Sequence, residues 1–217
     1  AKSLGLSVDK GNFRHFMMKE ISEQPDKVRG LLEGQFTVNG VQKEIFGPSA
    51  PEIFKEVESV QIVACGTSYH AGLVAKHWLE YVGVPCEVEV ASEYRYRRHV
   101  TRKGTLVVTI SQSGETADTL AALAEAQNLG IVGSLVICNV LESSLVRESD
   151  LSFMTHAGPE IGVASTKAFT TQLTALMMLA LVLSRRHGFD TGFEAHVVRQ
   201  LRMLPSALEK VLGMEAA

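Results

Sequence analysis

The sequence predicts an α/β fold: a three-layer αβα sandwich around a mostly parallel five-stranded sheet. Short apolar runs, rich in valine, isoleucine and leucine, alternate along the chain with segments of helical periodicity. The runs cover residues 60–65, 86–90, 105–110, 133–138 and 151–155. Such runs are typical of parallel strands that are buried on both faces, and their alternation with helices implies strand–helix–strand units. In addition, 46% of the 217 residues are hydrophobic, which is enough for one sizeable core.

Helical segments are expected on both sides of this sheet. We divide the chain into a helical leader over residues 1–50, the sheet-containing unit over 51–190 and a C-terminal helical segment over 191–217. Within the leader, Pro25 opens a second helix, because proline is favoured in the first helical turn. In the C-terminal segment, a helix that begins at Phe193 is expected to break at Pro205, since proline lacks the amide donor of a helix interior.

The clearest functional motif follows the third apolar run. Ser111-Gln112-Ser113-Gly114-Glu115-Thr116 connects that run to a helix that begins near Ala117. Free amides at a helix N-terminus stabilise anions, and here three hydroxyl groups and the Gln112 amide add further donors. Gly114 is expected to let the backbone approach a ligand closely. The alternative is that Ser113 or Thr116 serves only as the N-cap of this helix.

A second turn of the same kind follows the first apolar run. Gly66-Thr67-Ser68 leads from residues 60–65 into a helix expected over residues 69–81. Ligands of open parallel sheets bind at the carboxyl ends of the strands where the strand order reverses, so both turns could line one crevice. A monophosphate would fit there. The sequence has neither a P-loop nor the glycine spacing of a dinucleotide fingerprint, which argues against ATP and NAD.

A third loop, residues 156–166, follows the last apolar run and precedes the longest helix, which is expected over about residues 167–186. Ser165 or Thr166 is the expected N-cap of that helix, because serine and threonine are favoured at this position.

Three motifs in this order resemble the isomerase region of the glucosamine-6-phosphate synthase family, the isomerizing glutamine:fructose-6-phosphate aminotransferases. They are Ala64-Cys65-Gly66-Thr67-Ser68, the segment 111–119 and the segment 160–168. Residues 14–25 also resemble the stretch that joins the glutaminase and isomerase regions of that family. The resemblance implies the sugar isomerase (SIS) fold and the first of two SIS domains.

The resemblance also implies a set of substrate-binding residues. Thr67, Ser68, Ser111, Gln112, Ser113 and Thr116 would hold the 6-phosphate of fructose 6-phosphate or glucosamine 6-phosphate, and Val163, Ala164 and Ser165 would lie along the sugar. Family members convert fructose 6-phosphate and glutamine to glucosamine 6-phosphate and glutamate. A glutaminase domain supplies ammonia, and a glutamate of the second SIS domain moves the proton between C1 and C2.

Neither the glutaminase domain nor the second SIS domain is encoded in this sequence. We therefore expect a sugar-phosphate-binding fragment that contributes no catalytic residue and is inactive alone. In the complete enzyme its partners would be those two domains, and SIS domains commonly pair as homodimers. No cofactor is implied by the resemblance.

Two other functions remain open at this stage. A single SIS domain can act as a sugar-phosphate sensor, although the leader lacks a helix-turn-helix with a basic recognition helix. Alternatively, it can be an aldose–ketose isomerase with its own acid and base, for which Glu115 and Glu160 are the candidate bases. The segment 160–168 matches the aminotransferases, which favours the synthase.

Composition excludes several other classes. A net charge of −3 gives no electrostatic reason to expect nucleic acid, and the basic cluster over residues 95–103 is interpreted as the solvated face of a crossover helix. Three cysteines without paired spacing indicate a reducing, cytoplasmic compartment. The scattered histidines predict no metal site. The apolar run 175–183 is shorter than the roughly 20 residues of a membrane span, so no membrane association is expected.

Overall fold

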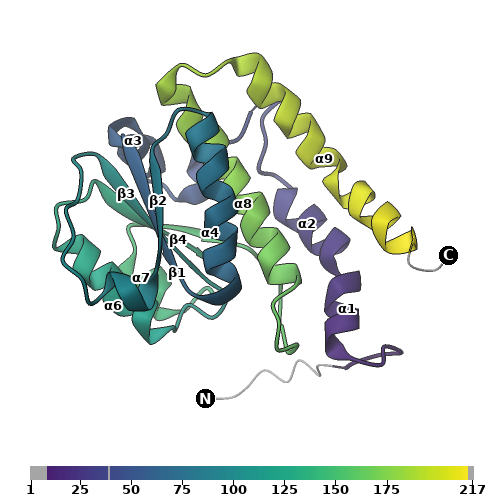
Figure 1. The fold of residues 1–217 in the computed structure, drawn as a ribbon. Helices are drawn as coiled ribbons and strands as arrows, with labels where there is room; N and C mark the ends of the chain where they lie inside the picture. Colours follow the sequence, from purple (N-terminus) through teal and green to yellow (C-terminus); the bar gives the residue numbers. More distant parts are fainter. Residues whose placement is uncertain (1–8, 39, 215–217) are drawn as a thin grey trace.

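The computed structural model describes residues 9–38 and 40–214, and its centre is a five-stranded sheet with the strand order β2-β1-β3-β4-β5. The strands are β1 (Ser59–Ala64), β2 (Cys86–Val90), β3 (Thr105–Ser111), β4 (Gly133–Cys138) and β5 (Leu151–Met154). Every adjacent pair is parallel. The α/β fold and the five strands predicted from the apolar runs are therefore confirmed (Figure 1).

The strand order reverses between β1 and β3, which lie side by side in the middle of the sheet. Their register pairs Ser59 with Thr105 at one end and Ala64 with Ile110 at the other. All seven residues of β3 are buried, because helices cover both faces of the sheet at this strand. The carboxyl ends of β1 and β3 therefore meet at the topological switch point, where ligands of doubly wound sheets bind.

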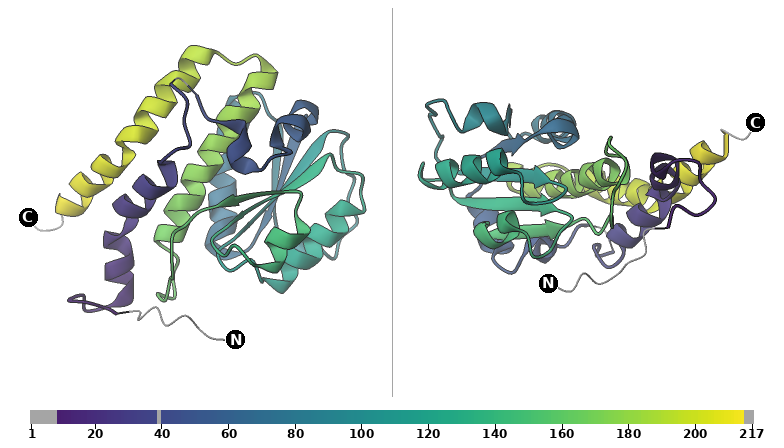
Figure 2. Two further views of the ribbon diagram at one scale, coloured as in Figure 1. Left: turned by 180° about the vertical axis from the view of Figure 1, so that it is seen from behind. Right: turned by 90° about the horizontal axis from the view of Figure 1, so that it is seen from below.

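Two helical layers cover the sheet, as two further views show (Figure 2). One face packs against α4 (Gly66–Tyr81) and α8 (Lys167–Ser184). The opposite face packs against α5 (Ala91–Tyr94), α6 (Ala117–Gln127) and α7 (Ser144–Glu148). The layers thus form the three-layer sandwich that the sequence predicts.

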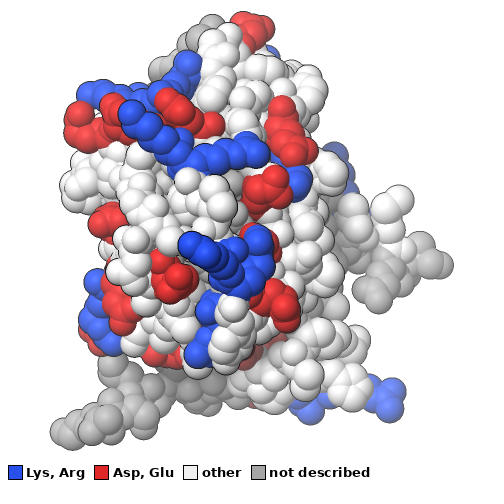
Figure 3. All heavy atoms as spheres, turned by 60° about the vertical axis from the view of Figure 1, so that its left-hand side comes forward, with Lys and Arg blue, Asp and Glu red and all other residues white. Residues whose placement is uncertain are grey.

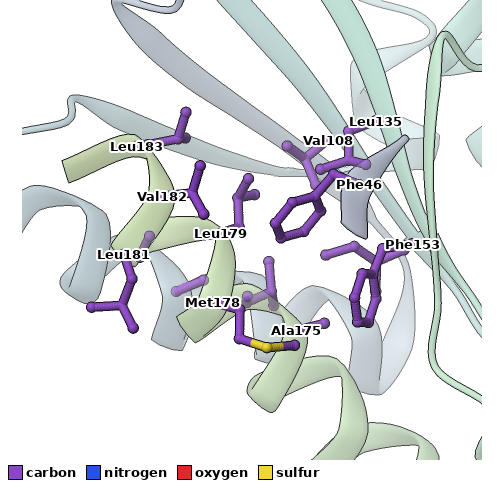
Figure 4. Close-up of a cluster of buried hydrophobic side chains, with 14 of the residues drawn as sticks. Phe46, Val108, Leu135, Phe153, Ala175, Met178, Leu179, Leu181, Val182 and Leu183 are labelled. Atoms are coloured by element: carbon purple, nitrogen blue, oxygen red, sulfur yellow. The ribbon is translucent and has the colours of Figure 1, made fainter. Parts of the chain in front are cut away.

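The largest part of the core lies between α8 and the sheet (Figure 4). Phe46 belongs to the short 3-10 helix η1 (Lys43–Phe46), and its ring lies 5.3 Å from that of Phe153 on β5. A second aromatic contact of 5.6 Å joins Phe46 to Phe54 of α3 (Ala50–Glu56). Phe46 is completely buried, so the end of the leader is part of the core.

The remaining helices form a flank beside α8 (Figure 1). They are α1 (Phe16–Ser22), α2 (Gln24–Leu32) and α9 (Thr191–Gly213), and a short 3-10 helix, η2 (Arg185–His187), follows α8. Pro25 lies in the first turn of α2, as predicted. The predicted break at Pro205 is wrong, because α9 continues through this residue to Gly213. Pro205 is buried on α9, which packs against α2 of the leader, and it lines a groove together with Leu32 and Phe36. This tertiary contact is not visible in the local sequence pattern.

The segment Lys167–His187 is long and apolar enough to span a membrane by length and composition. In this respect the expectation that the run is too short is wrong. However, 78% of its most apolar window is buried inside the protein. Such burial is that of a core helix in a soluble protein.

Candidate functional site

A polar cavity of about 240 Å³ lies at the carboxyl ends of β1 and β3. Its lining includes all six residues that the sequence predicts for the phosphate: Thr67, Ser68, Ser111, Gln112, Ser113 and Thr116. The structure therefore brings the two predicted turns together, although they are more than forty residues apart in the chain. No charged side chain is among the residues that line this cavity.

The first turn joins β1 to α4. The helix begins at Gly66, three residues earlier than predicted, so Thr67 and Ser68 belong to its first turn. Gly66 has a φ of 56°, a conformation that favours glycine. The side chain of the N-cap residue, Cys65, makes no capping hydrogen bond. Gly66, Thr67 and Ser68 line the cavity, and no N-cap side chain accepts hydrogen bonds from the first amides of α4, as in anion-binding helix N-termini.

The second turn joins β3 to α6. The hydroxyl oxygen of Ser111 accepts a hydrogen bond of 2.9 Å from the amide of Gly114, and that of Ser113 accepts one of 3.2 Å from the amide of Glu115. Thr116 occupies the N-cap position of α6, but its side chain makes no capping hydrogen bond. The interpretation that Thr116 serves only as a cap is therefore wrong, and Ser113 shapes the turn before the helix.

Gly114 is required by a contact within the protein that the sequence does not indicate. Its φ of 70° is a left-handed conformation, and a Cβ atom at this position would lie 2.1 Å from the hydroxyl oxygen of Ser143. The β3–α6 turn therefore lies in close contact with Ser143, the residue that precedes α7. This contact holds the turn against the neighbouring loop.

Sequence reasoning missed one hydroxyl of the cavity lining. Thr119 lies in the first turn of α6 and is 1% exposed, and its hydroxyl oxygen has no hydrogen-bond partner among the described residues. Its position three residues after Thr116 is the signal that could have identified it, because residues three apart share one face of a helix. Cys65 and Ile110 complete the lining.

The three residues expected along the sugar do not line this cavity. Val163 is fully exposed, and Ala164 is exposed beside it. The hydroxyl of Ser165 donates a hydrogen bond of 2.8 Å to the carboxylate of Glu160. These residues lie in the third loop, which leaves β5 through His156, a non-glycine residue with a φ of 49°.

The predicted N-cap position of the longest helix is confirmed, but the capping hydrogen bonds come from another residue. Thr166 is the N-cap residue of α8, but its side chain makes no capping hydrogen bond. Instead, the carboxylate of Glu160 accepts hydrogen bonds from the amides of Thr166, at 2.7 Å, and Ala168, at 3.4 Å. A carboxylate at a helix N-terminus is also favoured by the helix dipole. Glu160 therefore caps α8 and links the loop over residues 156–166 to the N-terminus of this helix.

Neither candidate base is arranged for proton transfer at the cavity. The carboxylate of Glu115 accepts a 2.7 Å hydrogen bond from the amide of Ser144, and this bond lowers the pKa of Glu115 below its ordinary value. A general base that works near neutral pH needs a shift in the other direction. Glu160 is engaged in capping α8. Neither residue lines the cavity.

The basic cluster is not on a helix, contrary to the prediction. Helix α5 ends at Tyr94, and the segment over residues 95–104 is irregular. Arg95 pairs with Asp118 at 2.7 Å, and Arg97 bonds Glu89 at 2.8 Å. Positive and negative side chains are interspersed on the face shown in Figure 3, which presents no continuous surface of one sign. Within the described residues, no group of three histidine, cysteine or acidic side chains could hold a metal ion.

The fold and the cavity define a doubly wound α/β protein with an uncharged crevice, rich in hydroxyl groups, at its switch point. Residues 53–182 match the SIS domain family. The chain belongs to this family, as the three motifs predict.

Similar proteins agree with this assignment. The chain is 60% identical over 212 residues to a glutamine–fructose-6-phosphate aminotransferase (isomerizing) of Pseudomonas putida, and the match covers 97% of this chain and 35% of that protein. The enzyme of the same name from Escherichia coli is 54% identical, with 95% of this chain and 34% of that protein covered. The chain thus spans about a third of the length of these relatives.

Solved structures give the same result. The C-terminal domain of glucosamine-fructose-6-phosphate aminotransferase from Francisella tularensis is 48% identical, with a TM-score of 0.88, and the match covers 92% of this chain and 56% of that chain. A putative phosphosugar isomerase from Silicibacter pomeroyi is 27% identical, with a TM-score of 0.71, and 89% of this chain and 55% of that chain are covered. The resemblance to the synthase family is therefore confirmed.

Proposed function

We propose that this chain binds the phosphate group of fructose 6-phosphate or glucosamine 6-phosphate, as the first SIS domain of an isomerizing glutamine–fructose-6-phosphate aminotransferase. The observation that carries the proposal is the cavity of about 240 Å³, which collects all six expected hydroxyl and amide side chains beside the N-termini of α4 and α6. The names of the most similar relatives support the choice of substrate.

The chemistry of the lining suits a phosphate ester. Hydroxyl and amide donors bind phosphate oxygens directly, and the two helix N-termini add favourable dipoles without a fixed positive charge. From a phosphate in this cavity, the carbon chain of the sugar would extend toward the loop that contains Val163, Ala164 and Ser165. The substrate, fructose 6-phosphate, and the product, glucosamine 6-phosphate, carry the same phosphate group. We therefore expect this cavity to bind both with moderate affinity.

The complete reaction requires parts beyond this chain. In the proposed enzyme, ammonia from glutamine condenses with the C2 ketone of the open-chain sugar, and a base from a second SIS domain transfers the proton that produces the aldose. Residues 51–190 would form the binding domain, residues 1–50 the joint to a glutaminase domain, and residues 191–217 the link to the second SIS domain. We place the enzyme in the cytoplasm, as a homodimer that needs no nucleic acid, membrane or cofactor.

A binding experiment tests the phosphate site. Isotope-labelled protein is titrated with glucosamine 6-phosphate and followed by NMR, and the same titration is performed on Thr116→Val. Because a hydrogen bond to a charged group contributes about 1.5 to 3 kcal/mol, the variant should bind on the order of 10- to 100-fold more weakly. Thr101→Val removes a threonine hydroxyl from the remote segment 95–104 and should bind like the unchanged protein. Equal affinity of all three proteins would contradict the proposal.

An activity measurement tests the division of labour. The purified chain should form no glucosamine 6-phosphate from fructose 6-phosphate and ammonia, because Glu115 and Glu160 are both held away from the cavity by hydrogen bonds to backbone amides. Clear turnover by this chain alone would show that it contains its own proton-transfer residue, as the single-domain isomerase alternative requires.

A further inference from the structure

Glu20 of α1 reaches across to the loop over residues 156–166 and binds its backbone. The side chain is buried, with 3% of the residue exposed. One carboxylate oxygen accepts a hydrogen bond of 2.5 Å from the amide of Ile161, and both oxygens lie 3.1 Å from the amide of Gly162. A residue of the leader therefore contacts the very segment that carries the expected sugar contacts.

Because the carboxylate of Glu20 is buried, its charge depends on the hydrogen bonds from the loop. A buried charge is costly unless hydrogen bonds replace its water. Among the described residues, Glu20 takes part in no ion pair within 4.0 Å, so the amides of Ile161 and Gly162 are its compensation. A loop conformation that turns these two amides away would leave the carboxylate buried without hydrogen bonds. The free-energy cost of burying an unpaired charge therefore disfavours such a conformation.

Two further side chains hold the loop on either side of the Glu20 contact. Asn139, which follows β4, donates a hydrogen bond of 2.8 Å to the carbonyl oxygen of Gly158 and accepts one of 3.2 Å from its amide. Glu160 binds the amide of Thr166 at the start of α8. Between these anchors, Val163 is fully exposed and Ala164 is exposed beside it, while the side chain of Ile161 is about half exposed.

Gly162 fits this arrangement because only a residue without a side chain allows the approach. A Cβ atom on Gly162 would lie 2.5 Å from a carboxylate oxygen of Glu20 and 3.5 Å from the Cα atom of Met17. The side chain of Glu20 and the backbone of the loop are thus in direct contact. Neighbouring leader residues act elsewhere, since Glu23 pairs with Lys167 and Gln24 binds Thr170, both on α8.

We propose that Glu20 is a positioning residue for the sugar: it fixes the loop conformation in which Val163, Ala164 and Ser165 meet the carbon chain, while the phosphate cavity is formed independently of it. This inference depends on the proposed function, because it assigns a role within the same sugar-phosphate site. It implies that a residue of the leader, which is not itself part of the cavity lining, contributes to the affinity for the sugar.

The test compares two ligands that share one group. Glucosamine 6-phosphate engages both the cavity and the loop, whereas inorganic phosphate engages the cavity alone. NMR titrations are carried out with the unchanged chain, Glu20→Ala, Glu20→Gln and the control Glu33→Ala, which removes an exposed carboxylate at the end of α2. We expect Glu20→Ala to weaken glucosamine 6-phosphate binding about tenfold, from the loss of the charged hydrogen bonds, and to leave phosphate binding unchanged.

The conservative variant sharpens the result. Glu20→Gln keeps one acceptor oxygen of nearly the same shape, so its affinity for glucosamine 6-phosphate should lie between those of the unchanged chain and Glu20→Ala. Amide hydrogen exchange at Ile161 and Gly162 should be faster in Glu20→Ala and close to normal in Glu20→Gln. Glu33→Ala should change none of these values.

Several outcomes would overturn the inference. Equal weakening of both ligands in Glu20→Ala would show a general structural role, and no change for either ligand would show that the loop conformation does not matter. If Glu20→Ala does not fold, Gly162→Ala perturbs the same contact from the side of the loop. This variant should also bind glucosamine 6-phosphate more weakly and bind phosphate with unchanged affinity. If the unchanged chain binds neither ligand, the proposed function itself is wrong.

Discussion

The hydroxyl oxygens of Ser111 and Thr116 lie 3.4 Å apart across the turn between β3 and α6. Ser111 is 4% exposed and already accepts a hydrogen bond from the amide of Gly114. Thr116 is partly exposed, and its hydroxyl makes no capping bond. The two hydroxyls therefore differ in function: one stabilises the shape of the turn, and the other remains available to a ligand.

This difference predicts that Ser111→Ala lowers both stability and affinity. Loss of a buried acceptor leaves the Gly114 amide unpaired, which should reduce the free energy of unfolding by about 1 to 3 kcal/mol. Urea denaturation measures this loss, and titration with glucosamine 6-phosphate measures the loss of affinity. Ser113→Ala is the control for stability. Its hydroxyl oxygen also accepts a hydrogen bond, from the amide of Glu115, but this bond is exposed and water can replace the lost acceptor, so the free energy of unfolding should change by less than about 0.5 kcal/mol. Equal stability of Ser111→Ala and Ser113→Ala would contradict the assignment.

Gly72 allows α4 to lie close to the sheet. A Cβ atom on this residue would lie 2.9 Å from Cγ2 of Ile62 on β1 and 3.1 Å from Cγ1 of Val88 on β2. Overpacking costs about 1 to 3 kcal/mol, and the gain in helix propensity from glycine to alanine returns up to about 1 kcal/mol. Gly72→Ala is therefore expected to destabilise the protein by about 1 kcal/mol in chemical denaturation.

Gly30 provides the matched control for this substitution. It lies inside α2, and a Cβ atom there would meet nothing within 4 Å. Gly30→Ala should thus stabilise the protein by up to about 1 kcal/mol. In addition, Ile62→Ala should couple favourably with Gly72→Ala, because the new methyl group fills part of the space that the isoleucine leaves. Additive effects of Gly72→Ala and Ile62→Ala would show that the steric contact is not the cause.

The sequence predicts the central strands well because β3 and β4 are buried on both faces, so their apolar runs are continuous. All six residues of β4 are buried, for example, and so are the seven of β3. The phosphate cavity was equally accessible to prediction, since parallel strands place the two turns at the same edge of the sheet. Local pattern and tertiary structure agree at these positions.

Elsewhere, tertiary contacts decide the outcome, and the sequence gives no local sign of them. Glu160 caps α8 from six residues before Thr166, a distance beyond any capping-box rule. Helix α9 continues through Pro205, which is buried on a helix that packs against α2 of the leader. The contact of Glu20 with Ile161 joins residues that are 141 positions apart. Such features depend on how the leader packs against the sheet-containing unit.

The buried thiol of Cys86 should make the folded protein less stable at high pH. Burial raises the pKa of its thiol to about 12, from an ordinary value of about 8.5. Between these values the unfolded chain releases the proton while the folded protein retains it, so the unfolded state is favoured as the pH rises. The free energy of unfolding should fall by about 1 to 2 kcal/mol between neutral pH and about pH 10 from this residue alone.

Comparison with Cys86→Ala isolates this contribution. The variant loses packing and is less stable at every pH, but its free energy of unfolding should fall less steeply than that of the unchanged protein above about pH 8.5. Urea denaturation at a series of pH values measures both slopes. Parallel curves for the two proteins would show that the thiol titrates normally in the folded state.

Glu160 is expected to stabilise the protein through the N-terminus of α8. Its carboxylate accepts hydrogen bonds from the hydroxyl of Ser165, at 2.8 Å, and from the amide of Thr166, at 2.7 Å. Because removal of an N-terminal capping side chain costs about 0.5 to 2 kcal/mol, Glu160→Ala should lower the free energy of unfolding by that amount. Glu160→Gln keeps an acceptor oxygen but loses the charge that favours a helix N-terminus, so its loss should be smaller.

Glu142 supplies the control, because it is exposed and its carboxylate makes no hydrogen bond or ion pair among the described residues. Glu142→Ala should leave the free energy of unfolding within about 0.5 kcal/mol of the unchanged value. The same denaturation series separates two roles of Glu160. A carboxylate that acted only as a general base could be replaced without a loss of stability, whereas a capping carboxylate could not. If Glu160→Ala unfolds at the same urea concentration as Glu142→Ala, then the carboxylate does not stabilise α8, and a chemical role for Glu160 has to be reconsidered.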